Sequence, residues 1–145
     1  MKRLPIALGT CLLMVTVLVT PALGAAQKVD LVPAVALPNA PGGGFVVFNN
    51  SAGHDNLKVT VALKGVAPVT DYDIYLFVDQ TSSGTKVGTV TTNRAGNATF
   101  HMKTTVPHGK HALGVDVTLH GSWADLYLSD HFYTLPGMSA TLTFK

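Results

Sequence analysis

The sequence predicts an all-β protein, a single antiparallel β-sandwich of about eight short strands. Glu is absent from the chain while Val, Thr and Gly are abundant, and this balance disfavours long surface helices and favours strands joined by turns. Beyond the N-terminal segment, no run of helical period exceeds one turn. Alternating segments are instead separated by Gly, Pro and Asn turns at intervals typical of a sandwich.

The N-terminal segment has the order of a secretory signal peptide. Two basic residues are followed by an apolar run and then by small residues before a cut between Ala26 and Gln27. The expected division is therefore a signal peptide at 1–26 and one β-sandwich domain at 27–145, a length that suits a single core. We expect a secreted or extracytoplasmic protein with no integral membrane segment after the signal is removed.

Charge and cysteine content exclude several classes of function. Ten Lys and Arg residues oppose eight Asp, and the formal net charge of +2 disappears with the two basic residues of the signal. A neutral chain without a basic run predicts no nucleic-acid partner and no anionic membrane partner. Cys11, the only cysteine, lies in the signal, so the mature chain has no disulfide, no thiolate nucleophile and no Cys-ligated metal.

The strands are identified from their alternation. The alternation is clearest at 57–63, where every second residue is apolar. The residues between them, beginning with Lys58, are expected to face solvent. The apolar stretch 29–37 contains Pro33, which restricts it to an edge strand or an extended lead-in. The strands expected after it are 45–48, 57–63, 72–78, 87–92, 97–106, 111–119, 123–128 and 138–144.

The strand at 72–78 departs from simple alternation. Its apolar face is regular, but the opposite face carries Tyr75 and Phe77 beside Asp73 and Asp79. A solvated strand would show only polar groups there, so we expect this face to be partly covered.

Two β-hairpins are predicted because their pairing would place apolar residues opposite apolar residues and polar residues opposite polar residues. If 94–96 is a three-residue loop with Gly96 in the left-handed conformation, Val90 stands opposite Phe100. A turn at 107–110 then pairs 97–106 with 111–119.

In that second hairpin, Phe100 faces Val117 on the core side and His101 faces Asp116 on the outer side. A slip of one residue would destroy both matches. We therefore expect the two hairpins to be neighbours in one sheet.

Residues 88–100, Gly-Thr-Val-Thr-Thr-Asn-Arg-Ala-Gly-Asn-Ala-Thr-Phe, resemble the strand-turn-strand signature of bacterial immunoglobulin-like domains of the invasin type. The Pro-x-Gly turn within 106–111 is similar to one that often follows in such modules. The resemblance implies an immunoglobulin-like sandwich outside the cell, often an adhesive or spacer module. That family offers no catalytic residues to carry over.

Six histidines in an exported chain invite a copper or zinc hypothesis, because neutral imidazole is a common ligand of both metals. The candidate ligands are His108 and His111 across a hairpin turn, with His120 or His131 at a distance. The chain has no His-x-His, which would put two ligands on one strand face. We therefore interpret the histidines as structural or solvated and assign no metal site.

Other constellations have simpler interpretations. The expected His101–Asp116 pair would orient a general base, but no Gly-x-Ser-x-Gly elbow accompanies it, so it is interpreted as a surface ion pair. Asp71 and Asp73 supply too few oxygens for calcium and are interpreted as solvated. The aromatic residues form either an exposed binding strip or part of the core, and the core is favoured. These residues are Tyr75, Phe77, Trp123, Tyr127, Phe132 and Tyr133.

The predicted function is a secreted, non-enzymatic binding or structural module with an unidentified protein or carbohydrate ligand. It has no assigned catalytic residue, no cofactor-binding residue and no cofactor. The alternative is an exported metal-handling protein that uses the surface histidines for copper or zinc, and a hydrolase is a more distant third.

Overall fold

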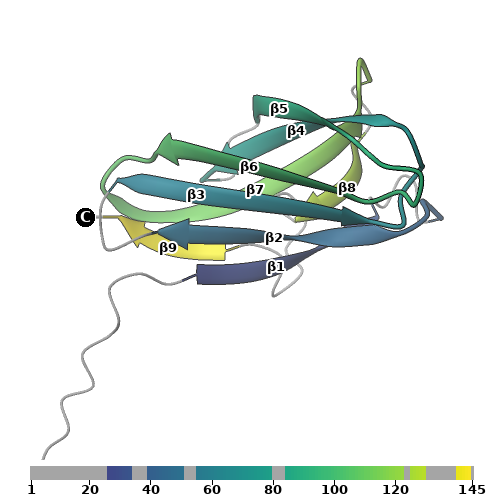
Figure 1. Ribbon diagram of the computed structural model, residues 1–145. Helices are drawn as coiled ribbons and strands as arrows, with labels where there is room; N and C mark the ends of the chain where they lie inside the picture. Colours follow the sequence, from purple (N-terminus) through teal and green to yellow (C-terminus); the bar gives the residue numbers. More distant parts are fainter. Residues whose placement is uncertain are drawn as a thin grey trace, which may run out of the picture.

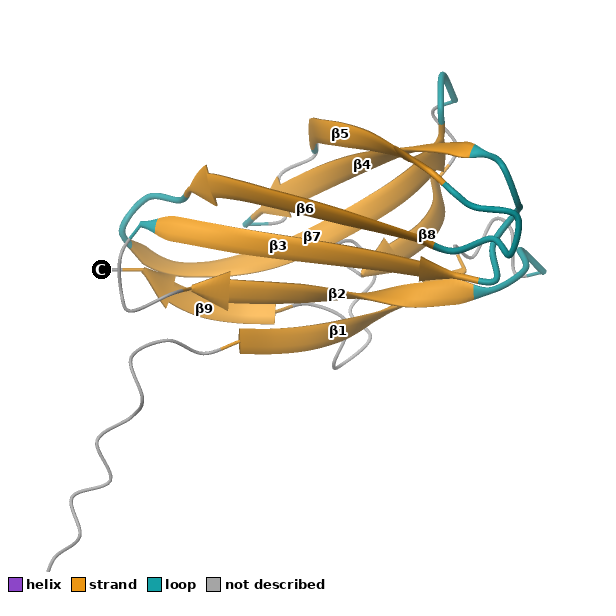
Figure 2. Ribbon diagram, viewed as in Figure 1, coloured by secondary structure: helices purple, strands orange, loops and turns teal. Residues whose placement is uncertain are grey.

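The computed structural model describes residues 26–33, 39–50, 55–79, 84–122, 125–129 and 140–144, and these ranges contain strands and connections without a helix (Figures 1 and 2). The strands are β1 (Ala26–Pro33), β2 (Gly43–Asn50), β3 (Asn56–Lys64), β4 (Asp71–Val78), β5 (Thr85–Thr91), β6 (Ala98–Thr105), β7 (Gly109–Leu119), β8 (Asp125–Ser129) and β9 (Ala140–Phe144). The all-β prediction is confirmed. Residues 1–25 of the expected signal peptide and Trp123 lie outside the described residues.

The strands form two antiparallel layers (Figure 1). The first sheet has the order β1-β2-β3-β6. The second sheet has the order β5-β4-β7, with β9 and β8 one after the other along the far edge of β7. Val32 and Pro33 at the end of β1 also pair with β8, so the two sheets are joined at that edge. The sandwich architecture is confirmed.

The core lies between the inner faces of the two sheets. On β3 the expected apolar face is confirmed, since Leu57, Val59, Val61 and Leu63 are each at most 1% exposed. The second sheet contributes inward side chains from β4, β7 and β9 to the same cluster. Its largest fully buried members include Tyr72, Phe48, Phe144, Ile74 and Leu113.

The predicted turn at 94–96 is confirmed, but the two predicted hairpin pairings are wrong. Gly96 has a φ of 73°, and the Asn93 backbone N–H donates to the Asn97 carbonyl at 2.9 Å. Beyond this turn the chain passes from one sheet to the other, so Val90 pairs with β4 and Phe100 pairs with β3.

The second pairing is wrong for the same reason. The turn at 107–110 joins β6 in the first sheet to β7 in the second. Phe100 therefore pairs with Val61, and Val117 pairs with Ile74. Both turns connect layers, which explains why matched apolar faces did not indicate neighbouring strands.

The strand β7 is central in the second sheet and is buried on both faces from Leu113 to Thr118. The outer face of β4 beside it is also covered, since Asp73 is 3% exposed and Phe77 is 7% exposed. The expectation that this face of β4 is covered is confirmed. In the part of the chain that is described, no helix has the length and apolar character to cross a membrane.

Candidate functional site

Asp73 is the centre of a buried polar cluster on the outer face of the second sheet. Its carboxylate accepts a hydrogen bond from the Thr89 hydroxyl at 2.6 Å and pairs with the Lys86 ammonium at 2.8 Å. The ring Nδ1 of His120 lies 2.9 Å from the same carboxylate. The cluster thereby links β4, β5 and the turn that follows β7.

The electrostatics of this cluster are those of a structural ion pair. Burial of the carboxylate raises its pKa, but the hydrogen bonds from Lys86, Thr89 and His120 outweigh burial and hold the pKa of Asp73 well below its usual range. A general acid at neutral pH needs a carboxyl pKa raised toward 7. Asp73 is therefore suited to holding strands together and not to donating a proton. The sequence interpretation of Asp73 as solvated is wrong.

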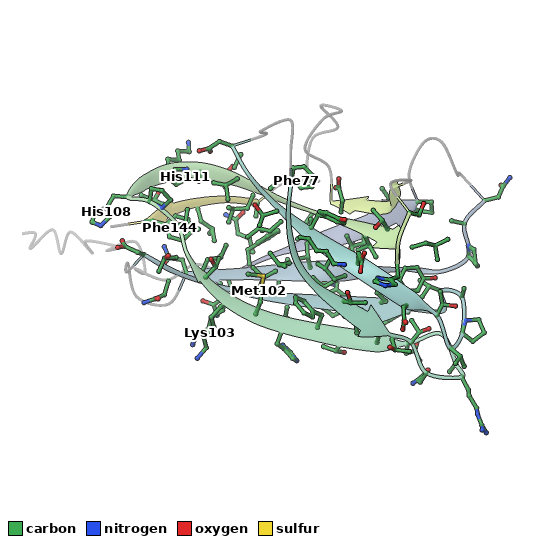
Figure 3. The ribbon with its side chains drawn as sticks, turned by 90° about the horizontal axis from the view of Figure 1, so that it is seen from above. Phe77, Met102, Lys103, His108, His111 and Phe144 are labelled. Atoms are coloured by element: carbon green, nitrogen blue, oxygen red, sulfur yellow. The ribbon has the colours of Figure 1, made fainter. Side chains whose placement is uncertain are left out.

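His111 and Asp79 form a second pair at the start of β7. His111 Nδ1 lies 2.5 Å from Asp79 Oδ2, and its Nε2 lies 3.0 Å from the Pro107 carbonyl. The hydrogen bond to Asp79 raises the pKa of His111, and the same bond lowers the pKa of Asp79. The ring also packs on Phe144 with 5.9 Å between centroids (Figure 3).

The three candidate metal ligands are placed against three different aspartates. His108 Nε2 lies 2.9 Å from a carboxylate oxygen of Asp55, while His111 and His120 have the partners described above. His111 and His120 are separated by nine residues of extended chain, about 30 Å. Across the described ranges, no group of three or more His, Cys, Asp or Glu side chains is placed to hold a metal ion. His131 lies outside those ranges.

The expected His101–Asp116 pair is wrong because β6 and β7 belong to different sheets. His101 is exposed on the first sheet, where its Nδ1 lies 3.0 Å from the Thr60 hydroxyl. Asp116 is buried in the second sheet, where its strand partners include Tyr75.

Of the expected aromatic strip, the structure places Phe77 and Tyr75. Phe77 is buried, and the position of Gly84 is so close to its ring that an added Cβ would lie 2.4 Å away. Tyr75 is half-buried on the same face of β4. Trp123, Tyr127, Phe132 and Tyr133 cannot be placed with them, because their side chains lie outside the described part of the structure.

The outer face of the first sheet collects lysines from three of its four strands. Lys28 comes from β1, Lys58 and Lys64 from β3, and Lys103 from β6, each at an outward position of its strand. Figure 3 shows Lys103 pointing away from the second sheet. Asp30 is the acidic residue that pairs on this face, at 3.8 Å from Lys28. The sequence has no basic run, but the strand pairing places these four lysines on one face of the sheet.

A groove of about 480 Å³ lies over β3 and β6 on this face. Its lining residues are Lys58, Val59, Thr60, His101, Met102 and Lys103. Lys58 and Lys103 are direct partners in the ladder, and Thr60 and His101 form the next outward pair. Among the described carboxylates, none forms an ion pair with Lys58 or Lys103.

The groove combines two cationic side chains with a hydroxyl and an imidazole. Among the described residues, neither lysine of the groove has an internal partner of opposite charge. The alternation in the sequence predicts outward positions for Lys58 and His101, but it does not predict the β3–β6 pairing that brings them beside Thr60 and Lys103. Compared with models of protein families, with curated proteins and with solved structures, the chain matches none.

Proposed function

We propose that the protein is a secreted, non-enzymatic binding module built on an immunoglobulin-like β-sandwich. The groove over β3 and β6 carries this proposal. Its volume of about 480 Å³ falls within the range of small-ligand sites, and Lys58 and Lys103 offer charge that no described side chain neutralises. Elsewhere, Asp73 and Asp79 are held by internal partners and have structural roles.

Strand order supports the immunoglobulin-like assignment. In that fold, the second and fifth main strands pair in one sheet and the third and sixth pair in the other. Here β3 pairs with β6 and β4 pairs with β7, which gives the same alternation between layers. Export rests on the order of basic, apolar and small residues in 1–26.

The test is a binding screen with a variant that fills the groove. Thr60 lines the groove next to Lys58 and Val59, so Thr60→Tyr would occupy part of the space without altering the lysines. The secreted protein is applied to an array of carbohydrates and extracellular proteins, and we expect a ligand whose binding the variant loses at an unchanged melting temperature. Binding that Thr60→Tyr leaves intact, or no ligand on the array, would overturn the proposal.

The metal-handling alternative makes a different prediction. A specific site at a hundredfold excess of metal over its dissociation constant would stabilise the fold by about 2.7 kcal/mol. That corresponds to a melting shift of roughly 10 °C in a domain of this size. Because no three His, Cys, Asp or Glu side chains of the described residues are placed to hold a metal ion, we expect no such shift with Cu(II) or Zn(II). A stoichiometric shift that His108→Ala abolishes would favour the metal-handling protein.

A further inference from the structure

We propose that the groove over β3 and β6 binds an acidic polysaccharide, whose carboxylate groups lie against the ammonium groups of Lys58 and Lys103. This inference rests on the proposed function, because it names the ligand class of the same groove. Three features favour this ligand: the register of two lysines, the groove between them and a second cationic position on the same sheet.

The register places two like charges directly opposite each other. Lys58 and Lys103 are ladder partners on adjacent strands, and like charges in such a position destabilise a sheet. No carboxylate of the described residues relieves the repulsion. An anion between the two ammonium groups would relieve it, since each lysine carries three donors and no acceptor.

The shape of the groove suits a sugar ring better than a small inorganic ion. A volume of about 480 Å³ is far larger than one carboxylate needs. The aliphatic stems of the lysines provide apolar walls for the C–H face of a ring, while their ammonium groups remain at the rim. The Thr60 hydroxyl and the His101 ring, 3.0 Å apart, supply donors and acceptors for ring hydroxyls.

A second cationic position lies across the same face. Lys28 stands 4.5 Å from the centroid of the Phe45 ring, and Lys64 stands 5.4 Å from it. Phe45 is on β2 and pairs with Ala62, two residues beyond Thr60 on β3, so it is offset from the groove by one strand spacing of about 4.8 Å and by about 7 Å along the strands. A chain with repeating carboxylates therefore reaches both positions at once, and linked contacts of this kind raise affinity without a new type of contact.

A polysaccharide fits this face better than a membrane does. Phe45 is half-buried and has the two lysines over its ring, so it is not presented for insertion between lipids. Lipid and nucleic acid are accordingly outcomes that the experiment distinguishes.

The experiment compares polygalacturonate with its methyl ester, which has the same backbone without the charge. Binding of the secreted protein is measured by calorimetric titration in 50 mM and 500 mM salt. We expect binding to the acid form that weakens at the higher salt, because screening shortens the reach of exposed charges. The double variant Lys58→Gln/Lys103→Gln should bind about tenfold more weakly, as expected for two exposed ion pairs.

The matched control removes the same charge elsewhere. Arg94 lies in the turn between β5 and β6, and Lys110 lies on β7, and both are exposed. The variant Arg94→Gln/Lys110→Gln should bind within about twofold of the unchanged protein. An equal loss in both double variants would overturn the groove assignment, because only the total charge would then matter.

The remaining outcomes separate the two proposals. Equal binding of the acid and its ester, lost in Thr60→Tyr, would overturn the acidic ligand class and leave the binding module intact. Binding of phosphatidylserine vesicles or duplex DNA, without binding of polygalacturonate, would also overturn the polysaccharide. No binding of any of these probes, together with no ligand on the array, would overturn both proposals.

Discussion

Replacement of Asp73 by Asn would test whether the buried polar cluster stabilises the second sheet. The substitution keeps the size of the side chain and an oxygen that accepts the Thr89 hydroxyl, but it removes the negative charge. The ammonium of Lys86 and the ring of His120 then face a neutral amide. We expect a lower free energy of unfolding at pH 7.

The size of the loss follows from exposure. A hydrogen bond to a charged group contributes about 1.5–3 kcal/mol when buried. The Asp73 side chain is 4% exposed, but those of Lys86 and His120 are 41% and 57% exposed, so solvent screens both pairs. The Asp73–Lys86 and Asp73–His120 pairs are then each expected to contribute as much stability as an exposed ion pair, up to about 1 kcal/mol. The total is about 1–2 kcal/mol.

The loss of stability in Asp73→Asn should be larger at neutral pH than in acid. Since the folded-state pKa of Asp73 is lowered, its contribution is present above the unfolded-state value of about 3.9 and disappears as the pH falls through the folded-state value. Urea unfolding at pH 7 should show a midpoint about 0.5–1 M lower in the variant. The difference should shrink steadily below pH 4.

Asp71→Asn is the matched control. Asp71 lies on β4 two residues away, is exposed, and accepts the Thr91 hydroxyl at 2.5 Å. Its replacement should change the free energy of unfolding by less than about 0.5 kcal/mol. An Asp73→Asn variant as stable as the unchanged protein, or a difference that is constant from pH 7 to pH 2.5, would refute the reasoning.

Three other changes have expected outcomes that unfolding experiments measure. Phe48→Ala removes a ring that is fully buried between the sheets and should cost about 3–5 kcal/mol. Gly96→Ala should cost more than Gly121→Ala, because both have a left-handed φ but an added Cβ would lie 2.0 Å from the Val66 carbonyl oxygen only at Gly96. His111→Gln should lower the free energy of unfolding by an amount that grows as the pH falls through the raised pKa of this histidine. The loss should reach its full size below about 6.5, the ordinary pKa of histidine. The same pH dependence of stability in the variant and the unchanged protein would contradict the His111–Asp79 pairing.

Strand positions could be predicted from the sequence because alternation is a local property. The apolar residues of 57–63 are the buried face of β3. Pro33 ends β1 beyond the last residue that pairs with β2, where it lies opposite Tyr127 of β8 and not at an open edge. The turn at Gly96 could be predicted for the same reason, since a left-handed φ favours glycine locally.

Strand pairing could not be predicted, because a matched pattern is compatible with more than one partner. Phe100 faces the core whether its strand pairs with β3 or with β7, and alternation does not distinguish the two. In a sandwich, a short turn joins either two neighbours in one sheet or two strands in opposite layers. Because the predicted pairing of β6 with β7 was wrong, the expected His101–Asp116 contact was wrong as well. For the same reason, the register pair Lys58–Lys103 was not predicted.

The distribution of charge follows from the same topology. Each strand of the first sheet adds at most two lysines at outward positions, so no basic run is visible along the chain, yet pairing β3 with β6 gathers them. In the second sheet, Asp73 is buried and paired with Lys86 and His120, so this carboxylate adds no uncompensated negative charge to the outer face. A chain with a formal net charge of only +2 therefore carries four lysines against one aspartate at the described outward positions of one sheet, and exposed charges act on anions within a Debye length of about 10 Å. Net charge constrains the partners of a β-sandwich only after the strands on each outer face are known.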